Sequence, residues 1–132
     1  LVLTECGILH YFVDLHPLAQ LVCDILKPKG QWVLHEFHPF NRKFTPKQEG
    51  SQLVLEGDYF SDAIIERPAP RATAAFAPEE LEAFPLGRYR YWQIGEIVSA
   101  VCSQGLRVET LVEHPHSEWG TIPGMFTLVA SK

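Results

Sequence analysis

The stretch LVLTECGILHYF, residues 1–12, decides the fold of this 132-residue chain. Residues 1–6 are largely apolar, which is typical of a buried strand, and the polar turn Glu5-Cys6-Gly7 ends that run. Helical periodicity follows from Asp14. A strand, a polar turn and a helix in this order present a ligand site at the carboxyl end of the strand in α/β proteins.

The next segment predicts a helix and a second strand. Asp14 is a suitable N-cap, and Pro17 falls in the first turn, where its missing N–H costs little. Residues 27–30 (Lys-Pro-Lys-Gly) end the helix, and we expect Gly30 to adopt a positive φ. Residues 31–37 form the second strand, parallel to the first through a right-handed crossover. The expected buried stripe of the helix is Leu15, Leu18, Leu21, Val22, Ile25 and Leu26.

Residues 39–92 lose this periodicity and hold most of the ten prolines. We interpret them as an insertion or substrate lid, with a little β structure of its own, within a single domain of residues 1–132. Order returns with a helix from Ile94 that Gly105 closes. A strand over 106–114 follows, with Leu106, Val108, Thr110 and Val112 on one face, and then an antiparallel strand over 125–130.

Composition restricts the classes of partner. The chain is 46% hydrophobic and 20% charged with a net charge of −5, which is typical of a folded globular domain. No basic stripe or apolar membrane-spanning stretch is found, so we expect neither a nucleic-acid nor a membrane partner, and a cytoplasmic location. The three scattered cysteines, Cys6, Cys23 and Cys102, suggest buried thiols of a reducing compartment.

Two motifs and the order of the last elements carry a family resemblance. Residues 5–10 (ECGILH), followed by Asp14 and Leu15, look like a fourth strand and its loop, and residues 26–30 (LKPKG) look like the turn before a fifth strand. The chain resembles the C-terminal half of a class I S-adenosylmethionine-dependent methyltransferase. This resemblance implies a Rossmann-like α/β fold of two parallel strands, an insertion, a helix and an antiparallel strand pair.

The resemblance also implies S-adenosylmethionine as cofactor and methyl transfer to a small-molecule acceptor. The Gly-rich cofactor loop of the family would lie upstream of Leu1, so we expect a truncated chain that contributes only part of the cofactor site. Without a neighbour, strand 1–5 would be a bare edge, which we expect a second copy or a swapped segment to cover. Glu5, Cys6, Gly7 and His10 are implied to line the cofactor cleft. The alternative is an ordinary strand-to-helix turn.

A second group of polar residues ends the strand 31–37. Glu36 and His38 share a face and are the predicted catalytic residues, because either can take a proton from a substrate. His35 points the opposite way and is assigned to substrate binding together with Tyr59, Tyr91 and Trp92. The alternative is that the histidines and Glu36 only hold the insertion in place, while the aromatic residues pin it to the domain.

Two other functions stay open. His35, Glu36, His38, His114 and His116 can be arranged as metal ligands in a metal-dependent α/β enzyme, although no metal-binding motif is present and we predict no metal. A non-catalytic binding or regulatory domain of the same fold is the other alternative.

Overall fold

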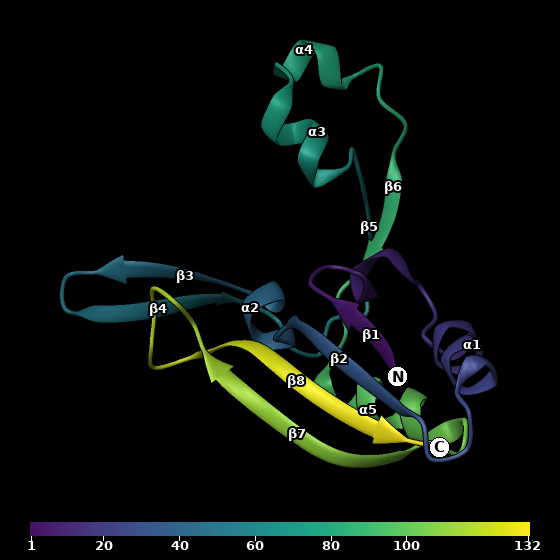
Figure 1. Ribbon diagram of the computed structural model, residues 1–132. Coiled ribbons are helices and arrows are strands. Elements are labelled where there is room, and N and C mark those ends of the chain that lie inside the picture. Colours follow the sequence, from purple (N-terminus) through teal and green to yellow (C-terminus); the bar gives the residue numbers. More distant parts are fainter.

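A four-stranded sheet forms the centre of the protein (Figure 1). The structure is a computed structural model that describes residues 1–69 and 73–132, and residues 70–72 only as part of a helix. The strand order is β1 (Val2–Glu5), β2 (Gln31–Phe37), β8 (Pro123–Ser131) and β7 (Arg107–Pro115). Strands β1 and β2 are parallel, and β7 and β8 are antiparallel, which confirms the two predicted pairings. Strand β8 also pairs with β2, in antiparallel direction.

Two helices cover one face of this sheet. Helices α1 (His16–Ile25) and α5 (Ile94–Ser103) pack against each other and against alternate residues of the strands, among them Leu34 and Phe126, which are fully buried. Apolar burial of this kind is the main stabilising contribution to the domain. The opposite face of β2, with Val33, His35 and Phe37, is only half-buried.

Local chemistry explains the bounds of α1. The N-cap is Leu15 and not Asp14 as predicted, because the helix begins only at His16, whose backbone N–H the Asp14 carboxylate accepts at 2.9 Å. Pro17 lies in the first turn, as predicted. The prediction for Gly30 is wrong in detail, because Lys29 takes the positive φ of 64°. Gly30 is required for a different reason: an added Cβ would lie 2.7 Å from the carbonyl oxygen of Lys27.

Two predictions of burial need correction. Leu21 and Ile25 are exposed, because the stripe of α1 that faces the sheet runs through Leu18 and Val22 instead. The cysteines are free thiols, but Cys6 and Cys102 are exposed and only Cys23 is half-buried. Cys6 belongs to a loop, and Cys102 falls on the face of α5 that points away from the core, so their apolar sequence neighbours do not bury them.

The predicted single face of the strand 106–114 is also wrong. A β-bulge at Glu109 inserts one extra residue, so Val108 pairs with Ala130 on the buried face of the sheet while Thr110 pairs with Val129 on the other face. Thr110 and Val112 therefore lie on the face opposite to Val108.

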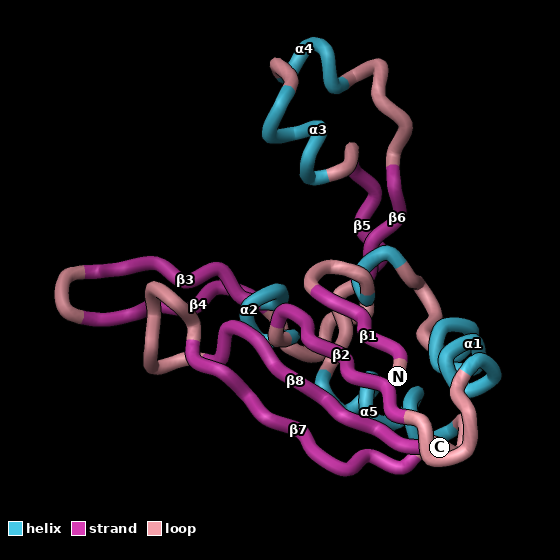
Figure 2. Tube along the Cα trace, in the orientation of Figure 1, coloured by secondary structure: helices cyan, strands magenta, loops and turns pink.

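Residues 39–92 are more regular than we expected (Figure 2). They form two antiparallel hairpins, β3–β4 and β5–β6, that project from the sheet in different directions (Figure 1). The second hairpin carries two short helices at its tip. The bounds are α2 (Pro39–Lys43), β3 (Phe44–Glu49), β4 (Gln52–Gly57), β5 (Ile64–Arg67), α3 (Pro70–Ala75), α4 (Pro78–Leu81) and β6 (Gly87–Arg90).

Strand β1 is one of the two edges of the sheet, and Leu1 and Leu3 at this edge are 84% and 56% exposed. That a second copy or swapped segment covers this edge stays a prediction. In the described part of the chain, no helix has both the length and the apolar character needed to cross a membrane.

Candidate functional site

The loop after β1 wraps its backbone around one carboxylate. Both oxygens of Glu36 accept the N–H of Gly7, at 2.6 and 2.8 Å, and Oε2 also accepts the N–H groups of Ile8 and Leu9. Oε1 accepts the N–H of Phe37 at 2.7 Å as well. A carboxylate has about four acceptor positions. Glu36 is therefore saturated by backbone donors, and it is only 3% exposed.

Positive φ angles shape this loop. Cys6 has φ = 23° and Gly7 has φ = 92°, and this pair turns consecutive N–H groups toward Glu36. Backbone N–H groups that converge in this way form an anion-binding concavity. Here an internal carboxylate fills the concavity, so the loop at the carboxyl end of β1 is held to the end of β2.

A cavity of about 570 Å³ opens beside the loop. Its walls come from the β1 loop, the end of β2, helix α2 and the β5–β6 hairpin, and they consist of Cys6, Gly7, His10, Tyr11, Phe37, Arg42, Arg67 and Tyr91. Arg42 and Tyr91 also line a neighbouring cavity of about 250 Å³ that reaches Asp58 and Ser61. Both cavities lie beyond the carboxyl end of the parallel pair, where open α/β sheets bind their ligands.

Two arginines point into the larger cavity. The guanidinium of Arg42 lies 3.9 Å from the centre of the Phe37 ring. Arg67 donates a hydrogen bond to the hydroxyl oxygen of Tyr91 at 2.9 Å, and its guanidinium lies 5.3 Å from the Tyr89 ring centre. These contacts hold both cations in place.

His10 is placed to exchange a proton with a ligand of this cavity. Neither of its ring nitrogens bonds to another group in the described part of the chain, and the ring packs beside Tyr11 with the centroids 4.4 Å apart. Burial lowers the pKa of His10 below its ordinary value of 6.5, and the charges of Arg42 and Arg67 lower it further against an opposing effect of Glu36. The imidazole is therefore neutral at neutral pH.

The Cys6 thiol is held in its protonated form. Partial burial of the thiol raises the pKa of Cys6, and the negative charges of Glu36 and Glu5 raise it further. Since the thiolate is the nucleophilic form, this environment opposes a nucleophilic role for Cys6.

His38 is buried away from the cavity and begins helix α2. Its Nδ1 accepts the N–H of Phe40 at 3.1 Å, which is the N-cap hydrogen bond of this helix. Nε2 lies 2.8 Å from a carboxylate oxygen of Glu113, at ion-pair distance but without the alignment of a hydrogen bond. Burial lowers the pKa of His38, and Glu113 partly opposes the effect.

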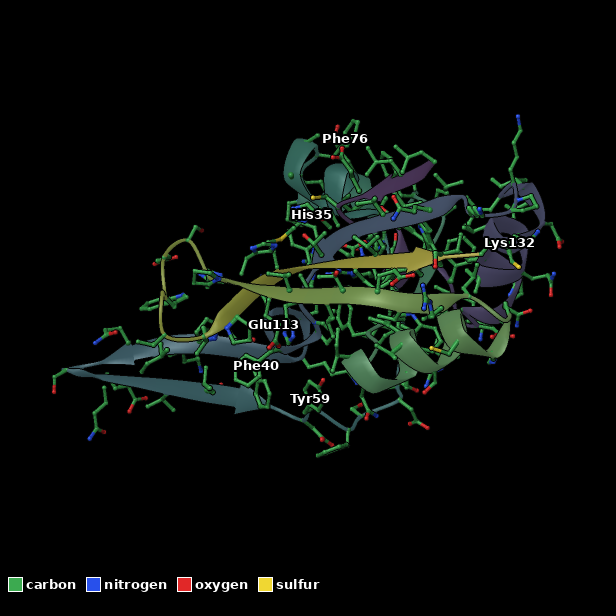
Figure 3. All side chains as sticks on the ribbon, turned by 60° about the horizontal axis from the view of Figure 1, so that its bottom comes forward. His35, Phe40, Tyr59, Phe76, Glu113 and Lys132 are labelled. Atoms are coloured by element: carbon green, nitrogen blue, oxygen red, sulfur yellow. The ribbon has the colours of Figure 1, made fainter. Side chains whose placement is uncertain are left out.

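The remaining residues assigned from sequence are dispersed. His35 lies on the open face of the sheet, where Thr127 Oγ1 is 2.9 Å from its Nδ1 (Figure 3). Tyr59 lies on the α5 side, and its hydroxyl accepts the N–H of Ile94 at the start of α5. Trp92 is buried and donates to the carbonyl of Leu9. Of the four residues assigned to substrate, only Tyr91 lines the large cavity.

The histidines do not assemble a metal centre. His35 and His114 share Thr127 as a hydrogen-bond partner, with ring centroids 5.7 Å apart. Within residues 1–69 and 73–132, no three side chains of His, Cys, Asp or Glu are grouped so that they could hold a metal ion.

Known proteins resemble this chain in structure and not in sequence. Comparisons with protein families and with curated proteins find no match. A candidate S-adenosylmethionine-dependent methyltransferase from Listeria monocytogenes aligns with a TM-score of 0.70 at 16% identity, over 99% of this chain and 60% of that chain. An S-adenosylmethionine-dependent methyltransferase from Mesorhizobium loti aligns with a TM-score of 0.68 at 18% identity, over 98% and 61%.

The fold is that of a class I methyltransferase. More fully, the chain has the Rossmann-like fold of the C-terminal part of such an enzyme, which confirms the predicted resemblance and fold class. The glycopeptide N-methyltransferase MtfA, in complex with S-adenosylhomocysteine, aligns with a TM-score of 0.55 at 15% identity, over 98% of this chain and 53% of that chain. The chain therefore spans about 60% of the length of the first two methyltransferases and less of MtfA.

Sequence reasoning missed Arg42 and Arg67 as site residues. The two lie 25 positions apart on different elements, α2 and β5, and neither belongs to a recognisable motif. The one available signal was the position of Arg42 just after the strand 31–37, because residues that follow a parallel strand lie at the ligand-binding edge of the sheet.

Proposed function

We propose that the protein transfers a methyl group from S-adenosylmethionine to a small-molecule acceptor. The observation that carries the proposal is the cavity of about 570 Å³ at the carboxyl ends of β1 and β2, which has the neutral imidazole of His10 in its wall. Its volume lies in the range of about 300–1,000 Å³ that is common for small-molecule sites. The methyltransferase fold supports the proposal.

Glu5, Cys6 and Gly7 fit one wall of the cofactor site. An added Cβ at Gly7 would lie 3.3 Å from Cε1 of His10. Because glycine has no side chain there, a ligand can come close to its backbone. Glu5 is exposed at the end of β1 and offers carboxylate oxygens to a donor such as an amino group. When bound, S-adenosylmethionine supplies a methyl group activated by the sulfonium, so the protein chiefly has to align the reacting groups.

His10 is the proposed proton acceptor. The substrate atom that receives the methyl group loses a proton in the same reaction. A ring nitrogen of His10 takes that proton, because the imidazole is neutral and has no competing hydrogen-bond partner in the described structure. General-base assistance of this kind contributes about 10²–10⁴-fold to a rate. Tyr91, on the same cavity, would contact the acceptor.

Glu36 and His38 take positioning roles in this proposal. The backbone donors around Glu36 occupy its acceptor positions, and Nδ1 of His38 caps α2. Glu36 therefore fixes the loop that carries His10, while His38 fixes the helix that carries Arg42.

Isothermal titration calorimetry of the whole protein with S-adenosylmethionine and S-adenosylhomocysteine tests the proposal. We expect saturable one-to-one binding of both, and weaker binding of adenosine, which lacks the amino-acid part. The absence of both heat and thermal stabilisation with the two cofactors would refute a methyltransferase function and favour a binding domain that kept only the fold.

A further inference from the structure

The arginines whose side chains the structure describes fall into two groups. Arg88, Arg90 and Arg107 each form an ion pair with a glutamate, at 3.6, 2.6 and 2.7 Å. Arg42 and Arg67 are the other two arginines with described side chains, and neither has a carboxylate partner within the described part of the chain. Both line the cavity of about 570 Å³.

The unpaired state of Arg42 and Arg67 contrasts with the ion pairs of Arg88, Arg90 and Arg107. The protein has 16 acidic residues against 11 Lys and Arg, so carboxylates are in excess. Among the described residues, no Asp or Glu lines the cavity. The Nε atoms of Arg42 and Arg67 are buried with no hydrogen-bond partner in the described residues, and so is the Nε of the ion-paired Arg90.

We propose that the methyl acceptor is an organic anion whose carboxylate or phosphate oxygens bind between Arg42 and Arg67. This inference rests on the proposed function, because it names the class of substrate for the same cavity. Guanidinium groups pair with such oxygens through two parallel hydrogen bonds, which fix orientation as well as affinity. Tyr91 contributes to this orientation, since its hydroxyl oxygen accepts a hydrogen bond from Arg67.

The aromatic residues of the cavity indicate the shape of the anion. Tyr11, Phe37 and Tyr91 line the same space as the two arginines. Aromatic walls favour a flat apolar body by stacking, while the arginines bind its charged end. An aromatic or similarly planar acid therefore fits better than a fully hydrated inorganic ion.

A bound anion would also act on His10. Arg42 and Arg67 lower the pKa of His10 through their charges. A negative group between the two arginines offsets their positive charges. The imidazole of His10 therefore accepts a proton more readily when the methyl acceptor is bound. Recognition of the charge and acceptance of the proton are thus coupled through the same two arginines.

Binding of benzoate and of its neutral analogue benzamide tests the proposal, with inorganic phosphate as a third probe. Each is titrated into the whole protein and into the variants Arg42→Gln, Arg67→Gln and Arg107→Gln. Arg107 is the control, because its side chain is 78% exposed and pairs with Glu109 far from the cavity. Thermal unfolding of each variant shows whether it remains folded.

We expect benzoate to bind more tightly than benzamide or phosphate. Arg42→Gln and Arg67→Gln should each weaken benzoate binding by about tenfold to a hundredfold, the usual effect of losing a hydrogen bond to a charged group. Arg107→Gln should leave benzoate binding unchanged. Equal binding of benzoate and benzamide, no binding of either anion in the millimolar range, or equal effects of all three substitutions would overturn the proposal.

A parallel titration with S-adenosylmethionine separates this inference from the proposed function. If both arginine variants bind the cofactor normally but lose benzoate, the arginines serve the acceptor, as proposed. If they lose the cofactor instead, the arginines bind its carboxylate and the inference is wrong while the methyltransferase function stands. If the native protein binds benzoate through both arginines but no cofactor, the proposed function fails and the anion is not a methyl acceptor, although the two arginines still form an anion site.

Discussion

Both carboxylate oxygens of Glu36 accept a hydrogen bond from the backbone N–H of Gly7, with N···O distances of 2.6 and 2.8 Å, although the two residues lie 29 positions apart in the sequence. Through this contact the end of β2 holds the loop after β1 in one conformation. The loop carries His10, so the geometry of the proposed active site depends on a buried carboxylate that does not itself face the ligand.

Replacement of Glu36 by Gln should destabilise the protein. The Gln amide has an NH2 group in place of one of the two accepting carboxylate oxygens. This NH2 group would face backbone N–H donors and could not accept from them, so some of the buried hydrogen bonds are lost. We expect a loss of about 2–4 kcal/mol in the free energy of unfolding, measured by urea denaturation. Glu66→Gln is the matched control, because Glu66 forms an exposed surface pair with Arg88 and should change stability little. Equal effects of the two substitutions would show that the loop does not need the carboxylate.

Replacement of Gly7 by Ala should strain the same loop. Gly7 has φ = 92°, and an added Cβ would lie 3.3 Å from His10. A side chain in the left-handed region costs about 1–2 kcal/mol, which should appear in the free energy of unfolding, together with weaker binding of S-adenosylmethionine. Gly120→Ala is the control, since nothing lies within 4 Å of an added Cβ there and φ is not positive. A Gly7→Ala variant as stable as Gly120→Ala would contradict the described backbone.

The rate of methyl transfer should depend on the ionisation of His10. Because burial and the two arginines lower the pKa of His10 below 6.5, the rate should rise with pH in the acidic range and become constant above about pH 6.5. His10→Ala should reduce the rate by about 10²–10⁴-fold and abolish this rise. Activity that stays high in His10→Ala, with an unchanged pH profile, would assign the proton to another acceptor.

Protein stability should fall at acidic pH, partly through His38. Its pKa in the folded protein is lower than 6.5, so the unfolded chain binds the proton more tightly. The contribution of His38 to the free energy of unfolding is therefore complete above about pH 6.5 and is lost as the pH falls toward the folded pKa. His38→Asn, which can still cap α2, should show a smaller loss. Identical pH dependence of the native protein and this variant, followed by chemical denaturation, would contradict the prediction.

The sheet and its helices could be predicted because their determinants are local. The apolar run at residues 1–6, the helical spacing after Asp14 and the strand 31–37 each act within a few neighbours, and the structure confirms the parallel pair that they imply. Details that depend on packing between distant elements were missed. The exposure of Leu21 depends on the rotation of α1 about its own axis relative to the sheet. The spacing of the apolar residues alone does not determine this rotation.

The site was harder to predict than the fold, since its residues come from separate hairpins and loops. His10 was identified from its place after the first strand, but Arg67 reaches the cavity only because β5 pairs with β6 and brings it to Tyr91. No spacing rule predicts from the sequence that Arg67 lies close in space to the loop after β1, more than fifty positions earlier. The saturation of Glu36 by backbone donors is likewise a property of the folded loop.

The most direct test of the central claim, that the loop after β1 forms part of a methyltransferase active site, is heteronuclear NMR of the whole protein titrated with S-adenosylmethionine. We predict saturable shifts of the backbone amide signals of Cys6 and Gly7 and of the ring of His10, with little change in the β3–β4 hairpin. Saturable binding that leaves these three residues unperturbed, or no perturbation of any signal, would contradict the account.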